Sequence, residues 1–325
     1  MPANLTPAYL KAEEAYRQAK TSAEKMAALE EMAATIPKHK GTEKMRADIR
    51  RRMAKLRAAA AEGKGKAGVD VFHVEKHGAG QVALVGTPNS GKSALVAAAT
   101  KARVNVAAYP FATHAPVPGM MPYEDVQIQL VDLPPVTAEG LVPGMMGAVR
   151  SADALLVCAD LSAVDLMEQV DTCFEVLSRR GVVREGQPLP EEGGAAMPML
   201  VVGTKLDLPG AADNVEALRE LRPELEPMVA TSAETGAGLE ELARRAFEML
   251  EVVRVYSKEP GKPADLNQPF ILPKGSTVLD MAAAVHREMA EHLKRARIWG
   301  SEKYDGQPVQ RDHVLEDKDV IELHV

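Results

Sequence analysis

Residues 86–93 read Gly-Thr-Pro-Asn-Ser-Gly-Lys-Ser and match the pattern G-x-x-x-x-G-K-[ST]. An apolar run suited to a buried strand, Val82–Val85, precedes this stretch, and a run suited to a helix, Ala94–Thr100, follows it. In this setting the glycines let the backbone curl until its N–H groups converge on phosphate oxygens, and the helix presents its positive end to the anion. The stretch therefore predicts a nucleotide-binding loop in an α/β fold.

The side chains of this loop have distinct expected roles. Lys92 is placed to neutralise charge on the outer phosphates, and the Ser93 hydroxyl is placed to ligate Mg²⁺. The loop by itself does not say which base is bound. The other loop positions expected to contact the nucleotide are Gly86, Pro88, Asn89, Ser90, Gly91 and Ala94.

Two later segments predict a guanine base. Thr204-Lys205-Leu206-Asp207 follows an apolar run, and Ser232-Ala233 follows the next one. The Asp207 carboxylate can accept both N–H groups on the Watson–Crick edge of guanine, whereas adenine would leave this charge unpaired, which is costly. A backbone N–H at Ser232 or Ala233 could meet the guanine carbonyl. Taken alone, residues 204–207 could also be a plain loop with a capping aspartate, but in this order they favour a GTP site over an ATPase site.

Two further residues are candidates for the metal. Asp132 ends an apolar run, where its carboxylate suits a water-mediated contact to Mg²⁺. Thr113 lies in the segment Tyr-Pro-Phe-Ala-Thr at 109–113 and is our candidate for a second Mg²⁺ hydroxyl on a mobile loop that the γ-phosphate would order. We predict that Lys92, Thr113 and Asp132 are the catalytic residues.

The pattern along the 325 residues predicts three domains. Residues 1–69 read as a basic helical segment, and residues 70–252 alternate short apolar runs with helical stretches, which favours a mostly parallel sheet. Residues 253–325 read as a small α+β unit with a single helix near 277–293. The expected strands of the middle domain are 82–85, 126–131, 155–158, 200–202 and 228–230, and its expected helices lie near 92–100, 164–180, 213–222 and 238–252.

Composition excludes several classes of protein. The longest apolar stretches are far shorter than the roughly 18 residues of a membrane span, and we see no secretory signal peptide. Two cysteines exclude a disulfide framework, so a reducing, cytoplasmic location is expected. The net charge is −7, yet residues 38–66 hold eleven basic and three acidic residues. That stretch is either a site for a polyanion or a solvated helix face. The histidines show no metal-ligand spacing.

The chain resembles the Obg-related GTPases, and within them the developmentally regulated GTP-binding (DRG) family. The resemblance rests on the loop motifs above, on YPFATHAPVPGM at 109–120, on Arg-Ser-Ala-Asp at 150–153, and on a C-terminal part similar to a TGS domain. The carriers of the TGS likeness are 253–265, 272–286, 295–300 and 313–325. The resemblance implies GTP hydrolysis with Mg²⁺ and association with ribosomes or RNA. It also makes Asn89 a candidate K⁺ ligand, and no membrane or DNA partner is expected.

Three departures from the family pattern bear on the rate of hydrolysis. Pro135 stands where the family has a glycine whose N–H meets the γ-phosphate, and proline has no N–H. Thr204 replaces the usual asparagine, which predicts weaker support for the loop. The switch segment is short, because Glu-Gly-Leu-Val-Pro-Gly at 139–144 stands where the family has EGA and a glycine-rich lead into a helix. As in this branch of the family generally, no glutamine follows Pro135 to position water, so we expect slow hydrolysis that needs a partner protein or a cation. Two functions stay open: a slow GTPase switch, or a GTP/GDP-responsive adaptor with negligible turnover.

Overall fold

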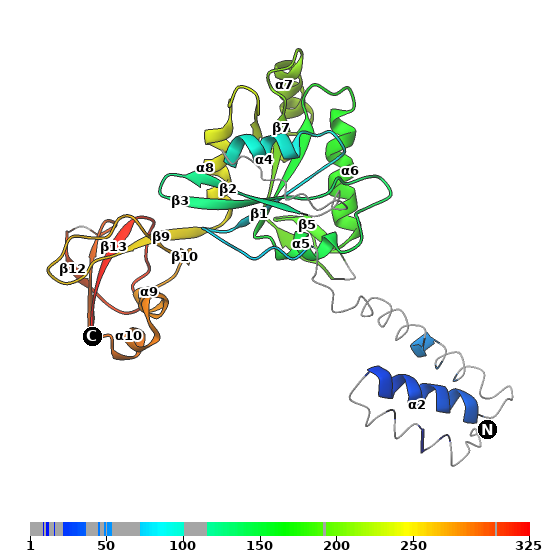
Figure 1. Cartoon of the computed structure of the whole chain (residues 1–325), viewed down its shortest axis with the longest axis horizontal. Helices are drawn as coiled ribbons and strands as arrows, with labels where there is room; N and C mark the ends of the chain where they lie inside the picture. The colour runs from blue at the N-terminus through cyan, green and yellow to red at the C-terminus, as the bar shows by residue number, and fades with distance from the viewer. Residues whose placement is uncertain are drawn as a thin grey trace. The chain divides into compact units, whose positions relative to one another are not determined.

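A computed structural model describes residues 9, 11, 12, 16, 22–36, 45, 49, 51–53, 72–100, 116–190, 193–302 and 304–325 (Figure 1). The chain divides into two compact units, Met1–Asp70 and Val71–Val325, which are described separately below. None of the helices within these described ranges combines the length and the apolar character that crossing a membrane requires.

The first unit contains the helix α2, Ser22–Thr35, and a small apolar cluster. Ile49 is buried in this cluster, while Met45 and Met53 pack against it. Leu56 and most of the basic stretch 38–66 lie outside the described residues. The buried members of the cluster are Tyr9, Ala12, Leu29, Met32, Ile36 and Ile49.

The second unit is built on a six-stranded sheet that is parallel except at one edge. Its strands are β1 Gln81–Gly86, β2 Val117–Tyr123, β3 Val126–Asp132, β4 Ala154–Asp160, β7 Met199–Thr204 and β8 Met228–Ala230, in the order β2-β3-β1-β4-β7-β8. Only β2, at the edge, pairs antiparallel with its neighbour β3. Every residue of β1, β4 and β7 is buried, as expected for strands covered on both faces. The prediction of an α/β fold with a mostly parallel sheet is confirmed.

Helices cover both faces of this sheet (Figure 1). The helices α4 Lys92–Thr100 and α8 Leu239–Met249 pack on one face. The helices α5 Met145–Ser151, α6 Leu166–Arg179 and α7 Ala211–Leu221 pack on the other. Two short strands, β5 Val182–Arg184 and β6 Ala195–Met197, pair with each other, and a 3₁₀ turn, η2, spans Pro223–Leu225.

The C-terminal part is a five-stranded sheet with two short helices packed against it. Its strands are β9 Val252–Ser257, β10 Phe270–Pro273, β11 Arg295–Trp299, β12 Gln307–Val309 and β13 Asp319–His324, in the order β10-β9-β13-β11-β12. The single helix expected near 277–293 is wrong. It is two helices, α9 Val278–Val285 and α10 Arg287–His292, because His286 has extended backbone with φ −165° and ψ 140°.

The parallel topology determines where polar groups meet. The carboxyl ends of β1, β3, β4 and β7 reach the same edge of the sheet, so the loops that follow them are neighbours. Ser93, Asp132, Asp160 and Asp207 lie at these strand ends or shortly after them, which brings residues from four separate parts of the chain to one edge.

Candidate functional site

The loop between β1 and α4 has the curled backbone that the sequence predicts. Asn89 and Gly91 have φ angles of 62° and 80°. A Cβ atom on Gly86 would lie 2.5 Å from the Ser90 Oγ, so this position also needs glycine for its close contact. The loop leads directly into the first turn of α4, which begins at Lys92. Its N–H groups and the helix N-terminus are therefore arranged for an anion.

Lys92 lies at the centre of this loop. Its side chain is 7% exposed, and its Nζ donates to the carbonyl oxygens of Gly86 at 3.0 Å and Thr87 at 3.2 Å, and to the Ser90 Oγ at 3.3 Å. All three acceptors are neutral oxygens, so none of these bonds is an ion pair. This arrangement suits a phosphate group better than any neutral ligand.

A hollow of about 430 Å³ opens over the loop. It is lined by Asn89, Ser90, Gly91, Lys92, Ser93, Ala94 and Lys205. The structure thus brings most of the predicted loop residues to one open hollow, and it adds Lys205 from the loop after β7. Gly86 and Pro88 belong to the same loop but do not line the hollow.

Ser93 and Asp132 form the part of the site that suits a metal ion. The Ser93 Oγ donates to the Asp132 Oδ2 at 2.5 Å, while the Asp132 Oδ1 is buried and has no hydrogen-bond partner. Burial raises the pKa of the Asp132 carboxyl, against the opposing effects of Ser93 and the charge of Lys92. A buried carboxylate oxygen without a partner, next to a hydroxyl, is a fitting donor set for a hard cation such as Mg²⁺.

The other residues considered as metal ligands add no further site within the described ranges. Thr113, our expected second Mg²⁺ hydroxyl, lies outside the described residues. Within the part of the chain that the structure describes, no group of three or more His, Cys, Asp or Glu side chains could hold a metal ion. Cys158 and Cys173 are buried and unpaired, and burial raises the pKa values of their thiols to about 12 and about 11.

A second hollow, of about 210 Å³, lies beside the first and contains Asp207. The Asp207 Oδ1 accepts a hydrogen bond of 2.5 Å from the Ser232 Oγ, which in turn accepts one of 3.1 Å from the Thr235 N–H. Ser232 is fully buried, and its hydroxyl orients the Asp207 carboxylate. The lining residues are Gly91, Ala94, Leu95, Thr204, Lys205, Asp207, Leu208, Thr231, Ala233 and Glu234, three of which also line the first hollow.

Thr204 connects the loop after β7 to the phosphate-binding loop. Its Oγ1 lies 2.8 Å from the Ser90 carbonyl oxygen and 3.1 Å from that of Ala159, and the residue is 3% exposed. Gly91 approaches so closely that a Cβ there would lie 3.0 Å from the Thr204 Oγ1. Thr204 thus supports the phosphate-binding loop through its one hydroxyl group, at the position where we expected weaker support than an asparagine gives.

The segment after Asp132 has no backbone N–H to offer to a phosphate. Within residues 133–136, the Leu133 N–H donates to the Leu84 carbonyl oxygen at 3.4 Å and the Val136 N–H donates to that of Gly86 at 2.9 Å. The remaining two positions are prolines, which have no N–H. The N–H donor that Pro135 lacks is therefore not supplied by its neighbours in this segment.

One acidic residue near the site was not indicated by any sequence motif. Asp160 ends β4, directly beside Thr204 in the parallel register, and its Oδ2 lies 2.5 Å from the Lys205 Nζ. Hydrogen bonds from Lys205 and Ser162 lower the pKa of Asp160 although burial acts to raise it. Its position in the sequence could have indicated it, because Asp160 ends an apolar run, and the next apolar run along the sheet is followed by Lys205.

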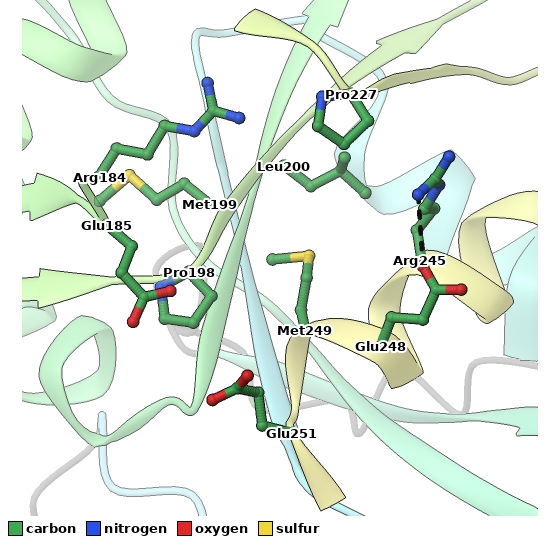
Figure 2. A pocket seen from close by; sticks show the side chains of 10 residues that line it. All are labelled: Arg184, Glu185, Pro198, Met199, Leu200, Pro227, Arg245, Glu248, Met249 and Glu251. Carbon is green, nitrogen blue, oxygen red and sulfur yellow. Dashed lines mark hydrogen bonds and ion pairs between the residues drawn. The ribbon is translucent and has the colours of Figure 1, made fainter. Parts of the chain in front are cut away.

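Another hollow, of about 340 Å³, lies near the opposite, amino-terminal ends of the strands (Figure 2). Met199, Leu200 and Met249 lie between Arg184 and Arg245, and Arg245 pairs with Glu248. None of the residues predicted for the nucleotide lines this hollow. It also lacks a phosphate-binding loop, so we assign the nucleotide to the paired hollows at the other edge.

Two family models match the chain. The model described as a 50S ribosome-binding GTPase matches residues 81–186, and the model of the TGS domain matches residues 253–325. The first match covers the phosphate-binding loop and Asp132. The second covers the whole C-terminal sheet with its two helices.

Whole-length relatives share both parts. The chain is 31% identical to a GTP-binding protein of Halobacterium salinarum, over 92% of this chain and 98% of that protein. It is 28% identical to the developmentally-regulated G-protein 1 of Arabidopsis thaliana, over 92% of this chain and 90% of the relative. Among solved structures, the YchF GTPase of Schizosaccharomyces pombe aligns with a TM-score of 0.50 at 14% identity, over 78% of this chain and 100% of that one, which reflects a shared fold.

Proposed function

Because this chain belongs to the developmentally regulated GTP-binding (DRG) family of Obg-related GTPases with a C-terminal TGS domain, we propose that it hydrolyses GTP slowly to GDP and phosphate and acts as a switch on ribosomes or RNA. GTP binding is common to the family. Hydrolysis, the metal, the partner and a cytoplasmic location are our proposals, as are the domain limits 1–69, 70–252 and 253–325.

One observation carries the proposal. Two adjoining hollows share Gly91, Ala94 and Lys205, with Lys92 in one and Asp207 in the other. A cation at one end and a carboxylate at the other match a ligand with an anionic tail and a base that donates hydrogen bonds. Guanine nucleotides have both features, whereas the Watson–Crick edge of adenine would not satisfy the carboxylate.

The residues of this chain have defined roles in that reaction. The loop N–H groups and Lys92 hold the phosphates, and Asp207 with the backbone at Ala233 selects the base. Ser93 directly, and Asp132 through water, would hold Mg²⁺, which when bound neutralises charge on the phosphates. Thr113 remains our candidate for the second hydroxyl ligand, and Asn89 for K⁺.

We expect the intrinsic rate to be low. No glutamine follows Pro135, and the prolines after Asp132 provide no N–H for the γ-phosphate. Charge that develops on the phosphate during hydrolysis must then be stabilised by a monovalent cation or by an activating protein partner. Turnover in K⁺ should therefore exceed turnover in Na⁺.

The ribosome or RNA partner rests on the printed description of the family that matches residues 81–186 and on two basic regions. Residues 38–66 are strongly basic, and β11 exposes Arg295 and Arg297 beside Trp299. Contacts to phosphate groups would make the association fall steeply with salt. Co-sedimentation with ribosomes at about 50 to 200 mM salt tests this, and association that is absent or insensitive to salt counts against it.

The second candidate function is a GTP/GDP-responsive adaptor with negligible turnover. It is favoured by residues 133–136, whose N–H groups are either absent or already bonded to β1 and the phosphate-binding loop. A single-turnover assay with GTP, in K⁺ and in Na⁺, separates the two functions. Hydrolysis that is sustained above the rate without protein excludes the adaptor.

Calorimetry on the full chain tests nucleotide binding itself. We expect GTP and GDP to bind in the presence of Mg²⁺, with ATP much weaker, and we expect Asp207→Asn to lose this preference. Glu234→Gln is a matched control, because Glu234 lines the same hollow yet lies outside the base-selecting sequence. The absence of heat with millimolar GTP and GDP would remove the proposal.

A further inference from the structure

Lys205 occupies a special place in the paired hollows. It lines both of them, so its side chain forms part of the wall where the base region meets the phosphate region. Its backbone has φ 58°, in the left-handed region that lysine rarely adopts. A lysine side chain has four rotatable bonds and costs up to about 2 kcal/mol to immobilise, so its direction needs a fixed partner.

That partner is Asp160. The Lys205 Nζ lies 2.5 Å from the Asp160 Oδ2, while the Asp160 Oδ1 accepts from the Ser162 N–H at 2.9 Å and from the Ser162 Oγ at 2.6 Å. Both oxygens of the carboxylate are thus engaged. Asp160 is 8% exposed and lines neither hollow.

The backbone of Asp160 is held in place as well. The Asp160 N–H donates to the Gln169 Oε1 at 3.0 Å, and the Gln169 Nε2 donates to the Asp165 Oδ1 at 2.8 Å. The register of β4 against β7 pairs Asp160 with Thr204, so the loop that carries Lys205 begins one residue away. The backbone position of Asp160 is therefore determined by the sheet and by α6, and Ser162 orients its carboxylate.

We propose that Asp160 is a positioning residue for the nucleotide site: by holding the Lys205 ammonium, it fixes the methylene stem of Lys205 as an apolar platform against which the purine ring packs. This inference rests on the proposed binding of guanine nucleotides. An ammonium held at its tip leaves the stem extended, and lysine stems readily cover apolar surface in this way. Because the side chain is ordered in advance, the ligand does not have to order it.

The burial of this pair distinguishes it from the many surface ion pairs of the chain. Exposed pairs contribute little, and Arg179 with Glu175 on α6 is an example, with both side chains more than 60% exposed. In the pair of Asp160 and Lys205 the two side chains are only 12% and 34% exposed. The platform would contact the ring face, which guanine and hypoxanthine share. Its loss should therefore weaken both bases equally, unlike the loss of Asp207.

The test compares GDP and IDP binding to the full-length protein by calorimetry with Mg²⁺. Asp160→Asn, which keeps the shape and removes the charge, should raise Kd about tenfold for both nucleotides and leave their ratio unchanged. Glu175→Gln, the matched control on an exposed pair, should leave both Kd values unchanged. Asp207→Asn should instead change the ratio.

A stability readout separates positioning from structural damage. The thermal midpoint of nucleotide-free Asp160→Asn should stay within about 3 °C of the wild type, which corresponds to less than about 1 kcal/mol. If it falls further, a double-mutant cycle with Lys205→Met decides the matter, because a shared role predicts that the double variant loses no more GDP affinity than either single variant.

Several outcomes overturn the inference. If the wild type binds GDP and Asp160→Asn binds GDP with an equal or lower Kd, then Lys205 does not depend on Asp160. The proposed function would stand in that case. Losses of GDP affinity that add up in the double variant of Asp160→Asn and Lys205→Met would also overturn the inference and leave the proposed function standing. A wild-type chain that binds neither GDP nor GTP would remove the proposed function, and this inference with it.

Discussion

The Val136 N–H donates to the Gly86 carbonyl oxygen across 2.9 Å, which joins the segment after Asp132 to the first residue of the phosphate-binding loop. The family resemblance implies a backbone N–H at position 135 that meets the γ-phosphate. Here Pro135 cannot donate, and its neighbour Val136 is already bonded. The segment is thus held in place by backbone hydrogen bonds to β1.

Restoring the missing donor should speed hydrolysis. Pro135→Ala and Pro135→Gly both create an N–H at this position, and one hydrogen bond to a charged phosphate corresponds to about a tenfold increase in rate. We expect the single-turnover rate to rise by about that factor in both variants. The pair controls for flexibility, because only the glycine variant loosens the backbone. No change in either variant would show that the γ-phosphate does not approach residue 135.

The base preference should depend on Asp207. In Asp207→Asn, an amide replaces the carboxylate that accepts from guanine, so xanthine nucleotides should gain and GDP should lose affinity by about 100-fold or more. Competition between GDP and xanthosine diphosphate measures this exchange. Ser232→Ala removes the hydroxyl that orients Asp207 at 2.5 Å, and it should weaken GDP about tenfold without a gain for xanthine. Unchanged selectivity in both variants would mean that the base lies elsewhere.

Thr204 should contribute to both stability and binding. Thr204→Val keeps the shape but removes the single hydroxyl proton that can be donated to the carbonyl oxygen of Ser90 or to that of Ala159, which costs about 1–2 kcal/mol of unfolding free energy. Urea unfolding measures the loss, and calorimetry should show weaker GDP binding because the two loops are no longer joined. Thr204→Ser retains the hydroxyl and serves as the control. Equal stability of the valine and serine variants would contradict this role.

The sequence predicted the parts of the site that are local. The phosphate-binding loop, Asp132 and the Asp207 segment each follow an apolar run, and the parallel sheet brings the ends of those runs together. The pair of Asp160 and Lys205 could not be predicted in the same way. It joins residues 45 positions apart through strand register, and neither motif refers to the other.

There are also physical reasons why some strands and helices were not predicted correctly. β2 contains two prolines and a glycine, which normally argue against a strand, yet it lies at the sheet edge where a missing N–H is tolerated. The helix near 277–293 breaks at His286, where no proline or glycine gave warning. Its first half was predictable, since Thr277 and Asp280 form a capping box.

The C-terminal sheet is joined to the turn between β2 and β3 by Arg254. This side chain is 2% exposed and bonds Glu124 at 2.5 Å, Asp125 at 2.6 Å and Asp317 at 2.6 Å, and its Cζ lies 4.9 Å from the centre of the Phe247 ring. Arg254→Met should lower the unfolding free energy by about 2–3 kcal/mol, because it leaves three carboxylates close together without their common cation.

Chemical denaturation of the full chain measures this loss. Arg245→Met is the control, since Arg245 is an arginine of α8 whose pairs with Glu241 and Glu248 are partly exposed to solvent. It should cost about 0.5 kcal/mol or less. A loss in Arg254→Met no larger than in the control would show that the cluster does not hold the two parts together.

The same cluster predicts a dependence on pH. Hydrogen bonds from Lys318 and Arg254 lower the pKa of Glu124, and those from Arg254 lower the pKa of Asp317 although burial opposes them. Burial and the bond to Asp125 raise the pKa of Tyr256 to about 12, so its hydroxyl stays a donor throughout.

Carboxylates with lowered pKa values stabilise the folded chain above their unfolded values, which are about 4, and this stabilisation is lost as the pH falls through their folded values. The stability difference between the wild type and Arg254→Met should therefore be constant from about pH 8 to pH 6 and shrink from about pH 5 downward. Urea unfolding of both proteins across this range measures it. A difference that is the same at about pH 3.5 as at pH 7 would contradict an electrostatic origin and leave only the packing of Arg254 on Phe247.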